Sequence, residues 1–152
     1  MTHMASLNDV VNWIPGAKLL GQGSALFNRV VTDTRTLVPG DLFVALKGDR
    51  FDANDMLADA HSRGAVAAIC HAGASPALSI AHLPRIEVED SKSALGTFAA
   101  TWRHRFTLPV VAVTGSNGKT TVTQMIASIF RAWKPQAMLA TQGNLNNDIG
   151  VP

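Results

Sequence analysis

The sequence is poor in cysteine, and its charges are few and nearly balanced. Cys70 is the only cysteine in 152 residues, which excludes an internal disulfide and a cysteine-based metal cluster and favours a reducing compartment, the cytoplasm. Charged residues make up 16%, and 13 basic residues against 11 acidic ones leave a net charge of +2. Such a balance argues against nucleic acid or an anionic membrane surface as the partner.

Long apolar runs and metal-binding histidine spacings are missing as well. No apolar stretch reaches the roughly 18 residues of a transmembrane helix, and the first residues lack the basic start and apolar run of a secretory signal. The five histidines show no H-x-x-x-H or H-x-E spacing and are expected at the surface or in the core. Hydrophobic residues make up 47% of the chain, so a packed core is expected.

The charge is distributed unevenly along the chain. Residues 1–90 hold seven basic and ten acidic residues, a net charge of −3, whereas residues 91–152 hold six basic residues and one acid, a net charge of +5. The asymmetry has two explanations. Either the second part faces an anionic ligand, or its helices carry solvated basic side chains.

Alternating short apolar runs and helical periodicities predict an α/β fold. A Pro-containing stretch at 82–84 places the expected domain boundary between residues 1–84 and 85–152. Helices are expected at 6–14, 54–63, 91–106 and 119–133, and strands at 29–32, 42–46, 65–70, 85–88, 109–113 and 136–140. Cys70 is expected to be buried, the three tryptophans to pack on helix faces, and the acids between 49 and 59 to be solvated or to cap helices.

The segment VVAVTGSNGKTT, residues 110–121, joins an apolar strand to a helix through a glycine-containing loop. Gly115 and Gly118 let backbone N–H groups turn inward, and the helix N-terminus adds positive potential, so the loop suits phosphates. Lys119 would reach the β- and γ-phosphates, and the Thr120 hydroxyl would ligate Mg²⁺. The spacing is shorter than the usual G-x-x-x-x-G-K-[ST], and an ordinary glycine-rich turn with a solvated lysine is the alternative. The candidate ATP-binding residues are Gly115, Ser116, Asn117, Gly118, Lys119, Thr120 and Thr121.

This loop resembles the one in the superfamily of Mur ligases and folylpolyglutamate synthases. Residues 30–57 (VVTDTRTLVPGDLFVALKGDRFDANDML) resemble the N-terminal uridine-nucleotide-binding domain of Mur ligases, which the folate enzymes lack. Residues 140–152 (ATQGNLNNDIGVP) resemble the segment after the phosphate loop in those members that add D-alanyl-D-alanine to UDP-N-acetylmuramoyl-tripeptide. The sibling ligase that adds the third amino acid is the alternative within the family.

The resemblance implies a small N-terminal UDP-sugar-binding domain followed by the start of a P-loop domain. It places Asp33, Thr34, Arg35, Lys47 and Phe51 beside the UDP group. From spacing alone, Asp33 and Arg35 could equally form a surface ion pair at a strand end. The resemblance also puts Asn144 and Asn146 on the substrate side, although asparagines of this spacing also favour plain turns.

The implied reaction is ATP-dependent amide formation through an acyl phosphate, with Lys119 and Thr120 as catalytic residues, Thr120 as a metal ligand, and ATP and Mg²⁺ required. After Thr120 the only side-chain carboxylate is Asp148, whereas the family holds Mg²⁺ with a later glutamate. We therefore expect an N-terminal fragment that binds without catalysing and self-associates through a truncated sheet edge. A stand-alone UDP-sugar-binding module and an unrelated P-loop nucleotidase or kinase are the other interpretations.

Overall fold

The computed structural model describes residues 3–48, 51–73, 82–141, 147 and 149–151. The chain separates into two compact units, residues 1–102 and residues 103–152. Among the described residues, no helix is both long and apolar enough to cross a membrane.

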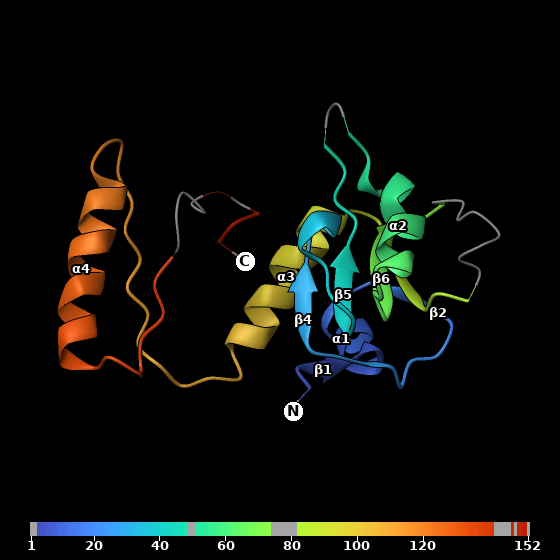
Figure 1. Cartoon of the computed structure of the whole chain (residues 1–152), viewed down its shortest axis with the longest axis horizontal. Coiled ribbons are helices and arrows are strands. Elements are labelled where there is room, and N and C mark those ends of the chain that lie inside the picture. The colour runs from blue at the N-terminus through green and yellow to red at the C-terminus, as the bar shows by residue number, and fades with distance from the viewer. Residues whose placement is uncertain (1–2, 49–50, 74–81, 142–146, 148, 152) are drawn as a thin grey trace. The chain divides into compact units, whose positions relative to one another are not determined.

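A five-stranded sheet forms the centre of the first unit, with strand order β2-β7-β6-β5-β4. The last four strands in this order run parallel, and β2 pairs antiparallel with β7. β4, β5 and β6 are visible side by side in Figure 1, with α2 next to them. The strands are β2 (Lys18–Leu20), β4 (Arg29–Val31), β5 (Asp41–Val44), β6 (Ala67–His71) and β7 (Arg85–Val88). A separate antiparallel pair joins β1 (Ala5–Ser6) to β3 (Leu26–Phe27).

Two helices of this unit, α1 and α3, begin at side-chain caps that the sequence supplies. At α1 the Ser6 hydroxyl accepts from the Asp9 N–H at 3.2 Å, and the Asp9 carboxylate accepts from the Ser6 N–H at 2.9 Å, which is a capping box. At α3 the Asp90 carboxylate accepts from the Ser93 N–H at 2.6 Å. The helical segments are α1 (Leu7–Trp13), η1 (Thr34–Thr36), η2 (Ala53–Met56), α2 (Leu57–Ser62) and α3 (Ser91–Arg103).

The sheet is buried on both faces, as its continuous apolar strands require. Leu42 and Val44 contribute to the core formed with α1 and α3, whereas Phe43 and Ala45 contribute to the core formed with η2 and α2. The pleat of β5 therefore divides its side chains between two helical layers. Cys70 lies in the second core and is fully buried, as predicted from the sequence; burial raises the pKa of its thiol to about 11.

The tryptophans differ from one another. Trp13 packs against Phe98, with ring centroids 5.5 Å apart, and against Trp102 at 6.2 Å, as expected for helix-face packing. Trp133 is 68% exposed and contacts Phe130 and the Lys134 ammonium. The packing expected for all three tryptophans therefore holds for two of them.

The division between the units differs from the expected boundary at residues 84 and 85. β7 pairs with β6 and β2 in the centre of the first sheet, and α3 packs on the same core. Residues 85–88 pair with one edge of β6 and β5 pairs with the other, so these residues belong to the first unit. The division between the units therefore falls between residues 102 and 103.

The second unit contains α4 (Lys119–Trp133), drawn in orange in Figure 1, and it matches the expected helix. The strands expected at 109–113 and 136–140 are not formed, and Val110 and Val111 are 64% and 58% exposed. A buried strand needs paired neighbours, and the described part of this unit supplies none. The sheet edge on which the expected self-association depended is therefore absent from the described residues.

Candidate nucleotide and nucleotide-sugar sites

The loop before α4 takes the backbone conformation that its glycines allow. Gly115 has φ +149° and Gly118 has φ +76°, both in the region that favours glycine. Gly118 is the residue that precedes α4, and its carbonyl accepts from the Val122 N–H at 2.9 Å. Because a helix offers no intrahelical acceptor to its first N–H groups, the start of α4 can receive an anion.

Lys119 lies half-buried at the first position of α4 and reaches back to the loop. Its Nζ donates to the Gly115 carbonyl at 2.6 Å, so the ammonium lies against the loop that precedes Lys119 in the sequence. Thr120 and Thr121 are exposed in the same first turn. The loop residues therefore bring together one ammonium, two hydroxyls and a helix N-terminus.

A cavity of about 410 Å³ lies in the first unit beside the residues that follow β4. It includes four of the five residues expected near UDP, namely Asp33, Thr34, Arg35 and Phe51. The carboxyl ends of the parallel strands meet at one edge of the sheet, which is where ligands bind in open α/β folds. Lys47 is not a lining residue, whereas Thr32, Phe43, Ala53 and Met56 are.

Asp33 and Arg35 form a close ion pair at this cavity. Arg35 donates to the Asp33 carboxylate from its backbone N–H at 2.9 Å, from Nε at 3.0 Å and from Nη2 at 2.6 Å. Hydrogen bonds from the Arg35 side chain and backbone lower the pKa of Asp33 to about 2. The Arg35 side chain is 85% exposed, so the ion pair expected as the alternative is present and lines the same cavity.

Thr34 contributes to the support of the cavity. It is buried, and hydrogen bonds from Arg63 and from the Thr34 side chain lower the pKa of Asp59. Thr34 also lines the cavity, beside Asp33 and Arg35. The side chains of Asp33 and Arg35, 38% and 85% exposed, are more accessible than the buried Thr34.

Lys47 lies near a different carboxylate. Lys47 and Asp52 form an isolated antiparallel bridge, and Lys47 Nζ lies 3.9 Å from Asp52 Oδ2. Phe51, which is 61% exposed, directly precedes Asp52 in the sequence and so lies beside this ion pair. Lys47 therefore approaches the site from the carboxyl end of β5 without lining the cavity.

Asn144 and Asn146 lie outside the described residues. Asn147 is described, and its Oδ1 accepts from the N–H groups of Ile149 at 3.2 Å and Gly150 at 2.7 Å. These bonds make an asparagine-capped turn. Among the described residues, no group of three or more His, Cys, Asp or Glu side chains is placed to hold a metal ion.

Sequence reasoning missed the cavity residues that come from other elements. Phe43 lies in the middle of β5, and Met56 ends η2, so neither belongs to the segment that carries Asp33. The available signal was the alternation of β5, which sends Phe43 to the face opposite Leu42 and Val44. Nothing in the local sequence indicates which helix covers that face.

A glycine-lined loop opening a helix, together with a cavity beside the carboxyl end of a parallel strand, is typical of nucleotide-binding α/β proteins. Residues 27–103 match the catalytic domain of the Mur ligase family, and residues 113–152 match the Mur ligase middle domain. The first match alone covers half of the chain. The chain therefore belongs to the Mur ligase family.

Several relatives of this chain share the name UDP-N-acetylmuramoyl-tripeptide–D-alanyl-D-alanine ligase. The UDP-N-acetylmuramoyl-tripeptide–D-alanyl-D-alanine ligases of Escherichia coli and Haemophilus influenzae are 45% and 44% identical over 98% and 90% of this chain. A UDP-N-acetylmuramoyl-L-alanyl-D-glutamate–2,6-diaminopimelate ligase of Chlorobium phaeobacteroides is 35% identical over 84%. The chain spans 30%, 29% and 25% of the length of these three relatives.

Solved structures agree with this likeness. MurF from Acinetobacter baumannii matches with a TM-score of 0.74 and 35% identity, over 96% of this chain and 30% of that one. MurF ligase from Thermotoga maritima, solved in complex with ADP, matches with a TM-score of 0.67 and 32% identity, over 82% of this chain and 27% of that one.

Proposed function

We propose that this chain provides the UDP-sugar site and the phosphate loop of a cytoplasmic, ATP-dependent ligase of peptidoglycan synthesis. The reaction would join D-alanyl-D-alanine to UDP-N-acetylmuramoyl-tripeptide. The Escherichia coli and Haemophilus influenzae ligases of that name, 45% and 44% identical, are more similar to this chain than the 2,6-diaminopimelate ligase at 35%, which supports this choice over the sibling enzyme.

The observation that carries the proposal is the geometry of the loop before α4. The positive φ of Gly118 turns the chain into the helix, and Lys119 is held against the loop by its 2.6 Å hydrogen bond to Gly115. A polyphosphate entering at the helix N-terminus would replace that carbonyl as the partner of the ammonium, because a phosphate oxygen is a charged acceptor. Ser116 and Asn117 add backbone N–H groups to the same turn.

The residues of this loop also fit the metal that ATP brings. Mg²⁺ prefers oxygen ligands and is usually held by few protein groups together with substrate phosphates. The exposed Thr120 hydroxyl in the first turn of α4 would be such a ligand. When bound, Mg²⁺ would supply charge neutralisation between the β- and γ-phosphates.

The reaction follows from what each reactant carries. The tripeptide carboxylate attacks the γ-phosphorus of ATP, forming an acyl phosphate and releasing ADP; the amine of D-alanyl-D-alanine then displaces phosphate and forms the amide. Lys119 would stabilise the charge that moves onto the β–γ bridging oxygen. Asp33, Arg35, Lys47 and Phe51 would hold the UDP end of the substrate.

Calorimetric titration of the 152-residue chain tests the proposal with two ligands, MgATP and UDP-N-acetylmuramoyl-tripeptide. We expect both to bind, and Lys119→Ala to weaken MgATP by about tenfold or more while leaving the UDP-sugar affinity unchanged. Lys134→Ala, near the other end of α4, is the matched control and should leave both affinities unchanged.

Each alternative interpretation gives a different pattern. A stand-alone UDP-sugar module would bind the UDP-sugar and not MgATP, whereas an unrelated P-loop nucleotidase or kinase would bind MgATP alone. Loss of UDP-sugar binding in Lys119→Ala would show that the two sites are not separate, which contradicts the proposal.

A further inference from the structure

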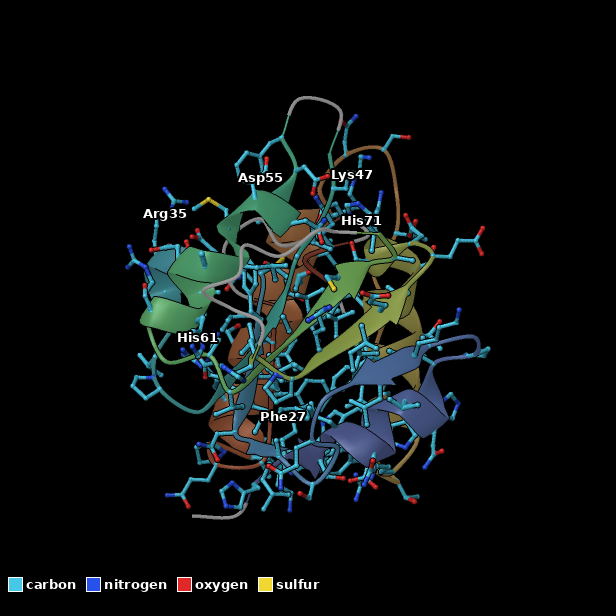
Figure 2. All side chains as sticks on the ribbon, turned by 90° about the vertical axis from the view of Figure 1, so that its right-hand side faces the viewer. Phe27, Arg35, Lys47, Asp55, His61 and His71 are labelled. Atoms are coloured by element: carbon cyan, nitrogen blue, oxygen red, sulfur yellow. The ribbon has the colours of Figure 1, made fainter. Side chains whose placement is uncertain are left out.

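One oxygen of Asp52 lies between two cationic or hydrogen-bond-donating side chains. Lys47 Nζ and His71 Nδ1 each lie 3.9 Å from Asp52 Oδ2. The three residues come from the carboxyl end of β5, the start of η2 and the end of β6. Figure 2 shows Lys47 and His71 toward the same end of this unit, with Phe27 toward the other end.

The other oxygen of Asp52 is firmly bound. Asp52 Oδ1 accepts from the Asn54 N–H at 2.9 Å and from Asn54 Nδ2 at 2.5 Å. Asn54 Oδ1 in turn accepts from the His71 N–H at 3.2 Å, so η2 is tied to the end of β6. These bonds from Asn54 lower the pKa of Asp52, and the charge of Lys47 adds to the effect. Asp52 is therefore a fixed, ionised acceptor.

His71 carries a polar atom whose hydrogen-bonding capacity is unused. Its Nδ1 is buried and makes no hydrogen bond within the described part of the chain. A buried polar atom without a partner costs free energy, so such an atom in a native structure calls for an explanation. Asp52 Oδ2, 3.9 Å away, needs only a small side-chain movement to become that partner.

We infer that His71 is a positioning residue for the nucleotide-sugar site: its Nδ1–H closes on Asp52 Oδ2 when Lys47 leaves that oxygen for the ligand's pyrophosphate. The inference rests on the proposed function, because it requires an anionic ligand that attracts Lys47. Lys47 and His71 approach the same oxygen at the same distance, so departure of one gives room to the other.

The exchange has a physical advantage. Without His71, moving Lys47 to the ligand would take the ion-pair partner away from Asp52 Oδ2, and that loss would be subtracted from ligand affinity. With His71, this oxygen exchanges an ion pair at 3.9 Å for a hydrogen bond, so it has a partner in both states. The backbone bridge between Asp52 and Lys47 is kept while the Lys47 side chain moves to the ligand. The neighbouring Phe51 therefore stays at the cavity.

The test uses the 152-residue chain and UDP-N-acetylmuramoyl-tripeptide as the probe. We expect His71→Leu to weaken binding about fivefold, a typical size for a coupling of this kind. His71→Gln, which keeps an N–H donor, should recover most of the loss. His61→Leu is the matched control, because His61 is an exposed histidine on α2 outside this cluster, and it should bind as the wild type does.

A spectroscopic measurement on the wild type separates positioning from mere packing. Nitrogen-15 spectra of the His71 ring should show Nδ1 protonated and hydrogen-bonded once the chain is saturated with the probe. An Nδ1 that is unprotonated at saturation overturns the inference, and this holds even if His71→Leu fails to fold.

The two proposals fail differently. If the wild type binds the probe and a folded His71→Leu binds it equally well, the role of His71 is wrong and the proposed function stands. If the wild type does not bind the probe at all, the UDP-sugar site is wrong and the role of His71 is rejected with it.

Discussion

The two units of this chain stabilise their candidate sites in different ways. Residues 1–102 bury both faces of a sheet, and the cavity beside β4 rests on buried residues such as Thr34 and Phe43. In residues 103–152, Ala127 is the only buried residue among those described. The loop before α4 in that unit takes its shape from local backbone geometry at Gly115 and Gly118.

The difference teaches that a binding motif and a hydrophobic core are separable. On α4, Met125, Ile129 and Trp133 recur at helical spacing and are 61%, 66% and 68% exposed. The stripe has the pattern of a core-facing surface, yet the described residues leave it uncovered. The chemistry of the loop therefore depends on the first turn of α4, while the apolar stripe contributes little to the stability of the chain as described.

The largest expected effect comes from one substitution made in both units. Ile86 is fully buried in β7, and Ile129 is 66% exposed on α4. Ile86→Ala should lower the free energy of unfolding of the first unit by about 2–5 kcal/mol, because it removes buried methyl groups and leaves a cavity. Ile129→Ala should change stability by less than about 0.5 kcal/mol, since alanine is also the better helix former. Urea unfolding monitored by circular dichroism measures both.

Equal losses from these two variants would break the comparison, because they would show that Ile129 is buried as deeply as Ile86. A loss of stability in Ile129→Ala and none in Ile86→Ala would reverse the comparison between the two units. Fluorescence of Trp13 and Trp102, which pack together in the first unit, assigns each transition to its unit.

A smaller effect is expected at the support of η1. Arg29 Nε and Nη2 donate to the two oxygens of buried Asp41 at 3.0 and 2.7 Å, and Nη2 also donates to the Thr36 carbonyl at 2.9 Å. Burial raises the pKa of Asp41, but the hydrogen bonds from Arg29 and from the Val38 N–H, with the charge of Arg29, outweigh it and lower that pKa. Arg29→Met should destabilise the first unit by about 2 kcal/mol, since it leaves a buried carboxylate without its cation.

Arg63→Met provides the comparison for Arg29→Met in the same urea experiment. Arg63, the residue after α2, pairs with Asp59 four residues earlier, with both side chains partly exposed, so its loss should destabilise the unit much less than the loss of Arg29. UDP-sugar affinity should also fall in Arg29→Met, because η1 carries Arg35. A stable Arg29→Met variant with unchanged affinity would show that the cavity does not depend on this buried pair.

Much of the fold could be predicted because its signals are local. The helix at 119–133 and the strand at 85–88 match their predicted limits residue for residue, since capping, glycine and apolar spacing act within each segment. β2 was missed because it is an edge strand whose pairing, Lys18 with Glu87, joins residues far apart in sequence. The strand expected at 109–113 failed for the converse reason: an apolar run forms a strand only where partners exist.

The candidate sites divide in the same way. Lys119 and its loop follow from a contiguous motif. Asp33, Arg35 and Phe51, which the resemblance places beside UDP, line one cavity, and their contact with UDP stays a prediction. The burial of Thr34 could not be foreseen, because it depends on tertiary packing around η1. The position of His71 depends on the pairing of β6 with β5, which no local pattern fixes.

A pair of glycine substitutions tests whether the loop depends on backbone conformation alone. Gly118 has φ +76°, whereas Gly96 lies within α3 and an added Cβ there would meet nothing within 4 Å. Gly118→Ala should introduce about 1 kcal/mol of strain and weaken MgATP binding, while Gly96→Ala should stabilise the first unit by up to about 1 kcal/mol. Calorimetry and urea unfolding give the two readouts. Unchanged MgATP affinity in Gly118→Ala would separate the glycine conformation from nucleotide binding.

The smallest expected effect is electrostatic and concerns the exposed pair at the cavity. Hydrogen bonds from Arg35 hold the pKa of Asp33 at about 2, below the ordinary value of about 3.9. Because the folded-state pKa is the lower one, the contribution of this pair to stability is complete above pH of about 4 and is lost as the pH falls toward 2.

Carbon-13 titration of the Asp33 carboxyl should give a midpoint near the lower value, and Arg35→Met should raise it toward the ordinary one. Arg63→Met should move that midpoint much less, since Arg63 acts on Asp33 only through its charge. A wild-type midpoint near 3.9 would mean that the pair does not persist in solution, leaving Arg35 fully available to an anionic ligand.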